Sequence, residues 1–237
     1  MRHPVPDPPV SGEQDGLAYA LFLPDGQAEG GIVILHGANS AKESHFDFAR
    51  AARASGLAAL AFDARGHGRS QGAFGPGAID DVLAMGALLR THAPSVAVRG
   101  SSMGGFLAIQ AAATDPEIAA VVAICPAPED FLLRGLRSGD LDFRVDMDAV
   151  EPWLGGLSLE RAAMELQADL LLIHAEGDEV IPSSASERLY LVAAEPKRLL
   201  ILPGGHHRSL QHDGEVQAET IRFLRSVLGR DRGPNAA

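Results

Sequence analysis

The feature that most constrains the fold is a series of short apolar runs that contain no alternating polar residues. Gly31–Leu35 (GIVIL), Leu57–Phe62 and Ala119–Ile124 are such runs, and longer amphipathic stretches separate them. Strands of this kind are buried on both faces, as in a parallel sheet covered by helices. The alternation of strands and helices indicates the same class. The sequence therefore predicts an α/β fold with a mostly parallel central sheet flanked by helices.

The remaining elements follow from apolar periodicity and from helix-stopping residues. We expect further strands at Leu17–Leu23, Ser95–Val98, Leu170–Ile173 and Leu199–Leu202, and helices over Lys42–Ser55, Ile79–Leu89, Met103–Thr114, Ser186–Ala194 and Glu215–Leu228. With 237 residues, the chain fits one domain spanning residues 1–237. The Pro-rich start and the tail from Arg230 to Ala237 are expected to stay outside the core.

Composition excludes several classes of protein. The first ten residues carry four prolines and no apolar segment, so they do not form a signal peptide. No apolar run approaches the roughly 20 residues of a membrane span. The net charge of −11 repels a phosphate backbone, which argues against a nucleic-acid partner. We expect a cytoplasmic protein that acts on a small molecule, with neither a nucleic acid nor a membrane as its partner.

The strand ending near Val98 leads into Gly-Ser-Ser102-Met-Gly, which fits the Gly-x-Ser-x-Gly pattern. Between a strand and a helix this pattern forms a sharp turn that exposes the serine, and the glycines leave room for the turn. Ser102 is therefore the predicted nucleophile. The alternatives are that Ser102 only caps the helix, or that Ser101, one place off the motif, is the reactive serine.

A serine nucleophile needs a base and a carboxylate that orients the base. Asp178 follows the predicted strand Leu170–Ile173, with Glu176 and Glu179 as alternatives, and we favour Asp178 as the acid. The doublet His206-His207 follows the last predicted strand, where the base belongs. On position alone, either histidine fits. No set of ligands has the spacing of a metal site, and we predict neither a metal nor an organic cofactor.

An oxyanion hole requires two backbone N–H groups aimed at the developing charge. The residue after the nucleophile, Met103, supplies one. The loop after Gly31–Leu35 supplies the other, and we assign it to Ala38. His36, at the start of that loop, is interpreted as a residue that braces the loop. Cys125 follows a different strand and is interpreted as a buried thiol.

Five segments, in order, resemble landmarks of α/β-hydrolase esterases and serine-aminopeptidase-like hydrolases: HGANSAKES, FDARGHGRSQG, GSSMGG, GDEVIP and GGHH. The resemblance covers about residues 16–228. It implies Ser102 as nucleophile, Asp178 as acid and His207 as base, with His206 where the family often has Asp. Serine separates the chain from dehalogenases and epoxide hydrolases, which attack with Asp, and from dienelactone-hydrolase-like enzymes, which use Cys. The segment around Asp63 resembles a structural loop of the family.

Between residues 127 and 167 the strand–helix pattern lapses, and a connection this long is typical of a functional lid. Its apolar residues are candidates for an acyl pocket, with Trp153 as the substrate-binding residue we favour. We predict a serine carboxylesterase for small to medium acyl chains. A peptidase or amidase, an acyltransferase, or a ligand-binding module on a hydrolase scaffold are the alternatives.

Overall fold

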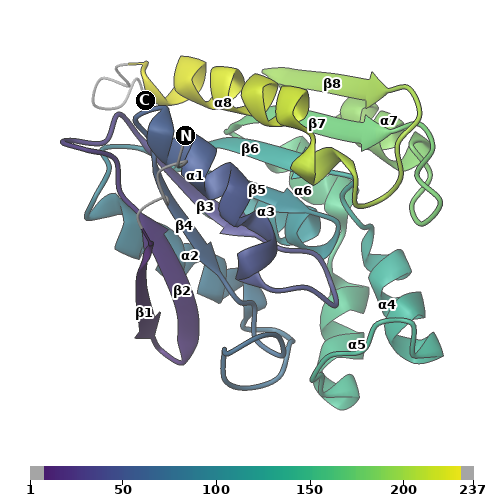
Figure 1. Cartoon of the computed structure of the whole chain (residues 1–237). Helices are drawn as coiled ribbons and strands as arrows, with labels where there is room; N and C mark the ends of the chain where they lie inside the picture. The colour runs from purple at the N-terminus through teal and green to yellow at the C-terminus, as the bar shows by residue number, and fades with distance from the viewer. Residues whose placement is uncertain (1–7, 231–237) are drawn as a thin grey trace, which may run out of the picture.

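The computed structural model describes residues 8–230 and contains one eight-stranded sheet (Figure 1). The predictions for residues 1–7 and 231–237 lie outside the described residues. The strands run in the order β1-β2-β4-β3-β5-β6-β7-β8, and those from β4 to β8 pair in parallel. The mostly parallel sheet is thereby confirmed. The strands are β1 (Val10–Gln14), β2 (Leu17–Phe22), β3 (Gly31–Leu35), β4 (Ala58–Phe62), β5 (Val96–Ser101), β6 (Ile118–Ile124), β7 (Asp169–Ala175) and β8 (Lys197–Leu202).

The burial of each strand explains which strands the sequence predicts. Every residue of β3, β4, β6 and β7 is buried, as continuous apolar runs require. Strand β1 was not predicted, because it is a largely exposed edge strand with no apolar run. It pairs antiparallel with β2, which in turn pairs antiparallel with β4.

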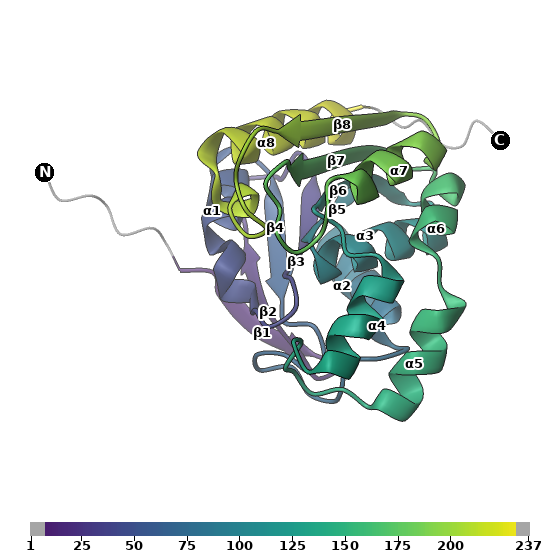
Figure 2. The same cartoon turned by 90° about the vertical axis from the view of Figure 1, so that its right-hand side faces the viewer.

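Helices cover both faces of the sheet, as Figure 2 shows. Helices α1 and α8 lie together on one face, and α2, α3, α6 and α7 cover the other. The predicted helix over Lys42–Ser55 is divided into a short 3-10 helix, Lys42–His45, and α1. The helices are α1 (Phe46–Ala54), α2 (Ala78–Arg90), α3 (Met103–Thr114), α4 (Glu129–Ser138), α5 (Met147–Gly156), α6 (Leu159–Glu165), α7 (Ser184–Val192) and α8 (Gly214–Leu228).

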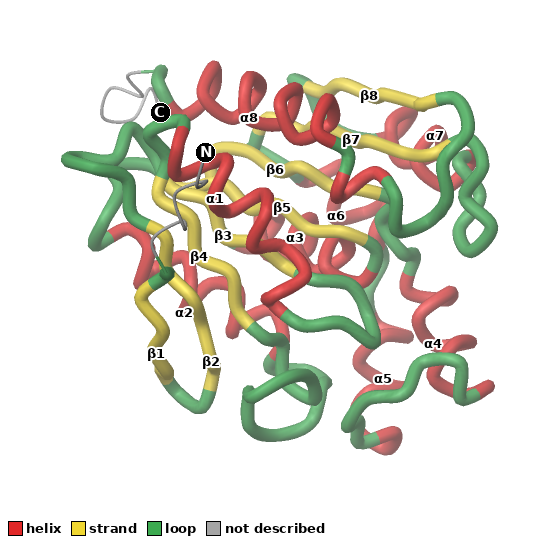
Figure 3. Tube along the Cα trace, in the orientation of Figure 1, coloured by secondary structure: helices red, strands yellow, loops and turns green. Residues whose placement is uncertain are grey.

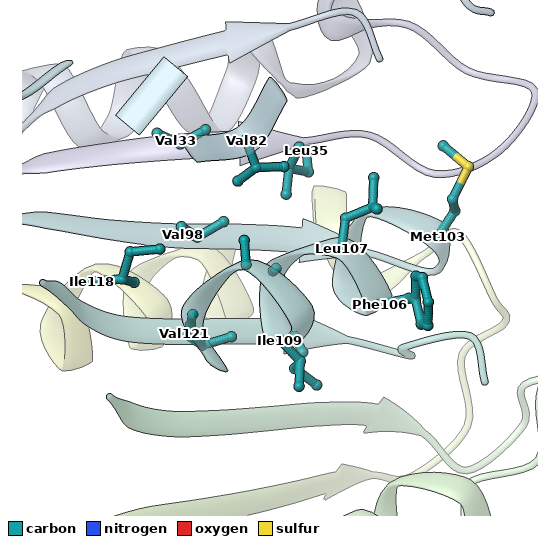
Figure 4. Packing of buried hydrophobic residues seen from close by; sticks show 14 of the residues in the cluster. Val33, Leu35, Val82, Val98, Met103, Phe106, Leu107, Ile109, Ile118 and Val121 are labelled. Carbon is teal, nitrogen blue, oxygen red and sulfur yellow. The ribbon is translucent and has the colours of Figure 1, made fainter. Parts of the chain in front are cut away.

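The core between the sheet and α3 fixes where the site stands. Val33, Val98 and Val121, from three neighbouring strands, belong to one buried cluster with Phe106 and Leu107 of α3 (Figure 4). All five are at most 1% exposed. Helix α3 is therefore held rigidly over β5, and its first turn meets the carboxyl end of that strand.

Three helices occupy the connection between β6 and β7. Helix α6 packs against α3 and α7 and completes the helical layer. Helices α4 and α5 pack on each other and lie beyond the carboxyl ends of the central strands, at the lower right of Figure 1. We call residues 129–156 the α4–α5 segment. Among the described residues, no helix combines the length and the apolar character that crossing a bilayer requires.

Candidate active site

Ser102 stands on a strained turn between β5 and α3. Its backbone has φ 53° and ψ −118°, a region that residues with a Cβ rarely adopt. A Cβ on Gly100 would lie 2.0 Å from the carbonyl oxygen of Gly104, and one on Gly104 would lie 2.5 Å from that of Leu35. Both motif glycines are thus required by backbone packing. The Ser102 side chain makes no capping hydrogen bond to α3, which excludes the hypothesis that Ser102 only caps this helix.

Ser101 is occupied elsewhere. It is buried, and its hydroxyl donates to Oε1 of Gln211 at 2.7 Å. Ser102 is half-buried and lines a pocket of about 840 Å³.

Asp178 and His207 form a hydrogen-bonded pair, in which Nδ1 of His207 lies 2.7 Å from Oδ2 of Asp178. The loops that carry them run side by side to the right of β7 and β8 (Figure 3). The N–H of Gly177 donates to the carbonyl of Gly204, and a Cβ on Gly177 would lie 2.5 Å from the carbonyl oxygen of Gly205. Close backbone packing therefore sets the separation of the loops that carry Asp178 and His207.

The alternatives to this pair take other places. His206 is exposed, and no hydrogen bond joins its ring to Asp178 within the described part of the chain. Glu179 accepts the backbone N–H of His207 at 3.1 Å and so supports the loop that carries His207. Glu176 is exposed.

The carboxylate of Asp178 is fully buried and well supplied with donors. Oδ1 accepts the N–H groups of Val180 and Ile181, at 2.9 and 2.8 Å. Burial alone would raise the pKa of Asp178, but hydrogen bonds from His174, His207 and Ile181 outweigh it and hold this pKa well below its usual range. Asp178 is therefore ionised throughout the neutral range.

His174 is a member of the site that the sequence analysis missed. Its side chain is fully buried, with Nδ1 2.7 Å from the hydroxyl of Ser186 and Nε2 2.9 Å from the carbonyl oxygen of Ile181. Because that carbonyl only accepts, Nε2 carries a proton. The sequence places this histidine directly after the predicted strand Leu170–Ile173 and four residues before Asp178, but no sequence pattern links its ring to the carboxylate of Asp178.

The loop after β3 approaches Ser102 from the other side. A Cβ on Gly37 would touch the Cβ of Ser102 at 3.4 Å. Within the described residues, the N–H groups of Ala38 and Met103 have no protein acceptor. His36 is buried; its Nδ1–H donates to the Gly37 carbonyl at 2.7 Å, and its Nε2 accepts the N–H of Ala64 at 3.0 Å. His36 thus braces the loop, as expected.

Asp63, at the end of β4, also braces this loop. It is fully buried and accepts the N–H and the ammonium of Lys42, at 2.8 and 2.7 Å, and the N–H of Arg69 at 2.9 Å. Burial would raise its pKa, but these hydrogen bonds lower it, so the carboxylate stays charged. With its oxygens engaged in this way, Asp63 has a structural place.

A pocket of about 840 Å³ brings Ser102, His207 and Ala38 together. Its apolar wall comes from the α4–α5 segment, through Phe131, Leu132 and Leu141, and from the loop after β7, through Val180. The volume falls within the roughly 300–1,000 Å³ of small-molecule pockets.

Trp153 is not among the pocket-lining residues of the described chain, which corrects its prediction as a substrate-binding residue. Its ring stands edge-on to Phe74 and Phe106, with centroids 5.5 and 6.4 Å away. Aromatic packing therefore draws it toward the core, where it holds α5 in place. The sequence could not distinguish this packing from pocket lining.

Cys125 is fully buried, as expected, and lies close to Asp178 and His207. Its sulfur and one ligand atom each of Asp178 and His207 lie within 4.8 Å of one another. Burial raises the pKa of the Cys125 thiol far above its usual range, so it is protonated at neutral pH.

Comparisons with known proteins place this geometry in a family. The chain is 30% identical to an uncharacterized protein of Mycobacterium tuberculosis, over 92% of this chain and 79% of the relative. Residues 26–131 match the serine aminopeptidase family S33. The chain belongs to the α/β-hydrolase superfamily, and its relatives indicate a hydrolase.

Two further comparisons, one with a sequence relative and one with a solved structure, add to this result. A monoacylglycerol lipase of Mycolicibacterium smegmatis is 26% identical, over 81% of this chain and 85% of that protein. The structure of Est1E from Butyrivibrio proteoclasticus with ferulic acid bound superimposes with a TM-score of 0.75 at 19% identity, over 93% of this chain and 100% of that one. At this identity, the second likeness shows the fold.

Proposed function

We propose that this protein is a serine carboxylesterase that cleaves esters with small to medium acyl chains through an acyl-enzyme. One observation carries the proposal: Ser102, on its strained turn, lines the same pocket as His207, whose other ring nitrogen is bonded to the ionised Asp178. An imidazole oriented in this way presents Nε2 as the base for a serine hydroxyl.

In the proposed mechanism, His207 takes the Ser102 proton as the serine oxygen attacks the ester carbonyl. The N–H groups of Ala38 and Met103 stabilise the oxyanion, helped by the positive end of α3. His207 then protonates the departing alcohol, which leaves an acyl group on Ser102. Water, deprotonated by His207, attacks this acyl group, and the carboxylic acid leaves as Ser102 regains its proton.

The pocket supports the choice of substrate. An apolar wall of Phe131, Leu132 and Leu141 suits an acyl chain, and the volume of about 840 Å³ suits a small or medium one. The likeness to a monoacylglycerol lipase agrees with ester chemistry. We propose that the α4–α5 segment is the lid of this pocket, since it supplies most of the apolar wall.

The test combines covalent labelling with turnover. A fluorophosphonate should label the wild type at Ser102 and should not label Ser102→Ala. On p-nitrophenyl acetate, butyrate and octanoate, Ser102→Ala should lose about 10⁵–10⁶-fold in kcat, with an unchanged circular dichroism spectrum. An unlabelled wild type that hydrolyses none of these esters would refute the proposal. Faster cleavage of aminoacyl anilides than of esters would instead identify an amidase.

A further inference from the structure

The side chain of Asn39 joins the loop after β3 to the α4–α5 segment. Its Nδ2–H donates to the carbonyl of Asp140 at 3.1 Å, and its Oδ1 accepts the N–H of Asp142 at 2.8 Å. These partners lie 101 and 103 residues away in sequence. Both ends of one amide are therefore engaged by the backbone between α4 and α5.

The backbone of Asn39 is built for this position. Its φ is 55°, in the left-handed region that asparagine tolerates better than most residues. Asn39 directly follows Ala38, and on the other side of Ala38 stands Gly37, where an added Cβ would lie 3.4 Å from the Cβ of Ser102. A change in the orientation of Asn39 must therefore pass into the peptide units that orient the Ala38 N–H.

The other end of the link also reaches the pocket. Asp140 and Leu141 line it together with Asn39. Leu141 packs tightly on α4, since a Cβ on Gly135 would lie 2.8 Å from its Cγ. The side-chain amide of Asn39 thus holds the segment that carries Leu141 of the apolar wall. The backbone of Asn39 directly follows Ala38, whose N–H is a proposed oxyanion donor.

We propose that Asn39 is a positioning residue that couples the seat of the α4–α5 segment to the Ala38 N–H, so that pocket wall and oxyanion hole are set together. This inference rests on the proposed function. It differs from a purely structural role in one respect: loss of the amide should lower kcat even for an ester too short to need the wall.

Three variants separate the coupling from general damage. Asn39→Gly permits the positive φ but removes both hydrogen bonds. Asn39→Asp keeps the acceptor for Asp142 and loses the donor to Asp140. Asp142→Pro removes the N–H that donates to the Oδ1 of Asn39, and it substitutes no residue of the loop after β3. Gln71→Ala is the matched control, because it removes an exposed side-chain hydrogen bond, to Glu13, away from the pocket.

The first measurement is kcat and KM on p-nitrophenyl acetate and octanoate. The loss of two hydrogen bonds corresponds to about 5–150-fold. We expect kcat on acetate to fall by about tenfold in Asn39→Gly and less in Asn39→Asp, with KM for octanoate raised as well. Asp142→Pro should lower kcat on acetate too, and combining it with Asn39→Gly should add little. A normal kcat on acetate in Asn39→Gly, with only KM for octanoate changed, would overturn the coupling.

The second measurement is independent of catalysis. Amide hydrogen exchange in Asp142→Pro should become faster in residues 36–40, and in Asn39→Gly in residues 139–143, while Gln71→Ala matches the wild type in both. Unchanged exchange in residues 36–40 of Asp142→Pro would overturn the coupling even if the wild type hydrolysed no ester. A wild type without esterase activity but with the expected exchange would contradict the proposed function alone.

Discussion

Nε2 of His174 lies 3.3 Å from Oδ2 of Asp178, the same oxygen that binds His207. The Nε2–H is shared between this oxygen and the carbonyl of Ile181, and the hydroxyl of Ser186 fixes the tautomer from the other side of the ring. The proposed acid thus has a second histidine behind it, which orients the carboxylate that orients the base.

Removal of the His174 ring should weaken this orientation. A hydrogen bond to a charged group is worth about 1.5–3 kcal/mol, which corresponds to about 10–150-fold in rate. We expect His174→Leu to lose about that factor in kcat on p-nitrophenyl butyrate, and His174→Gln, which keeps an N–H near the Nε2 position, to lose less. Active sites should be titrated with a fluorophosphonate, so that any unfolded fraction is not counted. Full activity in His174→Leu would show that the ring only fills space.

The histidine doublet gives a direct test of the base. Because only His207 of the two bonds Asp178, His207→Ala should reduce kcat by about 10⁵–10⁶-fold. His206→Ala should retain most of the turnover. Comparable losses in the two variants would contradict the assignment.

The strain at Ser102 should appear as a gain in stability when it is relieved. Glycine adopts φ 53° without a steric penalty, and strain of this kind costs about 1–3 kcal/mol. We expect Ser102→Gly to be inactive but to melt a few degrees higher, at about 2–4 °C per kcal/mol. Ser101→Gly is the matched control and should melt lower, since it loses the hydrogen bond to Gln211. A lower melting temperature for Ser102→Gly would show that the turn is unstrained.

The contact of Gly104 with β3 predicts a steep cost for one methyl group. An alanine Cβ there would meet backbone oxygens of Leu35 and His36 at 2.5 and 2.7 Å, and overpacking costs about 1–3 kcal/mol or more. Gly104→Ala should therefore lower both the free energy of unfolding in urea and the esterase activity. Gly155→Ala, in α5, meets nothing within 4 Å and should leave stability equal or slightly higher. Equal stability of the two variants would contradict the packing.

Stability should fall on mild acidification. Burial, with the nearby His36, lowers the pKa of His67 to about 4, and burial also lowers the pKa values of His36 and His45. Below the unfolded value of about 6.5, the unfolded chain binds protons that the folded chain does not, so the free energy of unfolding decreases from about pH 6.5 towards pH 4.

The share of His67 is testable. Its lowered pKa corresponds to about 3 kcal/mol lost across that window. Urea unfolding at pH 7, 5.5 and 4.5 should show a smaller decrease for His67→Phe, which keeps an aromatic ring against Phe143. Identical pH dependence in the variant and the wild type would exclude His67 as a contributor.

How much of the structure the sequence predicts depends on whether each feature is encoded by neighbouring residues or by residues far apart in the chain. The parallel strands and the turn at Ser102 are encoded locally, by apolar runs and by two glycines, and all were foreseen. The order of strand ends predicts that Asp178 lies near the doublet His206-His207, but only the family resemblance favours His207, which is the histidine that bonds Asp178. Contacts such as Asn39 with Asp142, or Trp153 with Phe74, join segments whose spacing carries no pattern. Strand β1 was missed because an exposed edge needs no apolar run.

The α4–α5 segment is fastened near its middle largely through main-chain atoms. Arg144 exchanges backbone hydrogen bonds with Gly66 and Phe74, and both partners of Asn39 are peptide groups. Such main-chain hydrogen bonds do not depend on which side chains lie between the bonded residues. Substitutions at Phe131 or Leu141 therefore leave these main-chain hydrogen bonds in place, and the lining of the pocket is free to change in evolution or in the laboratory while the backbone around it stays as it is.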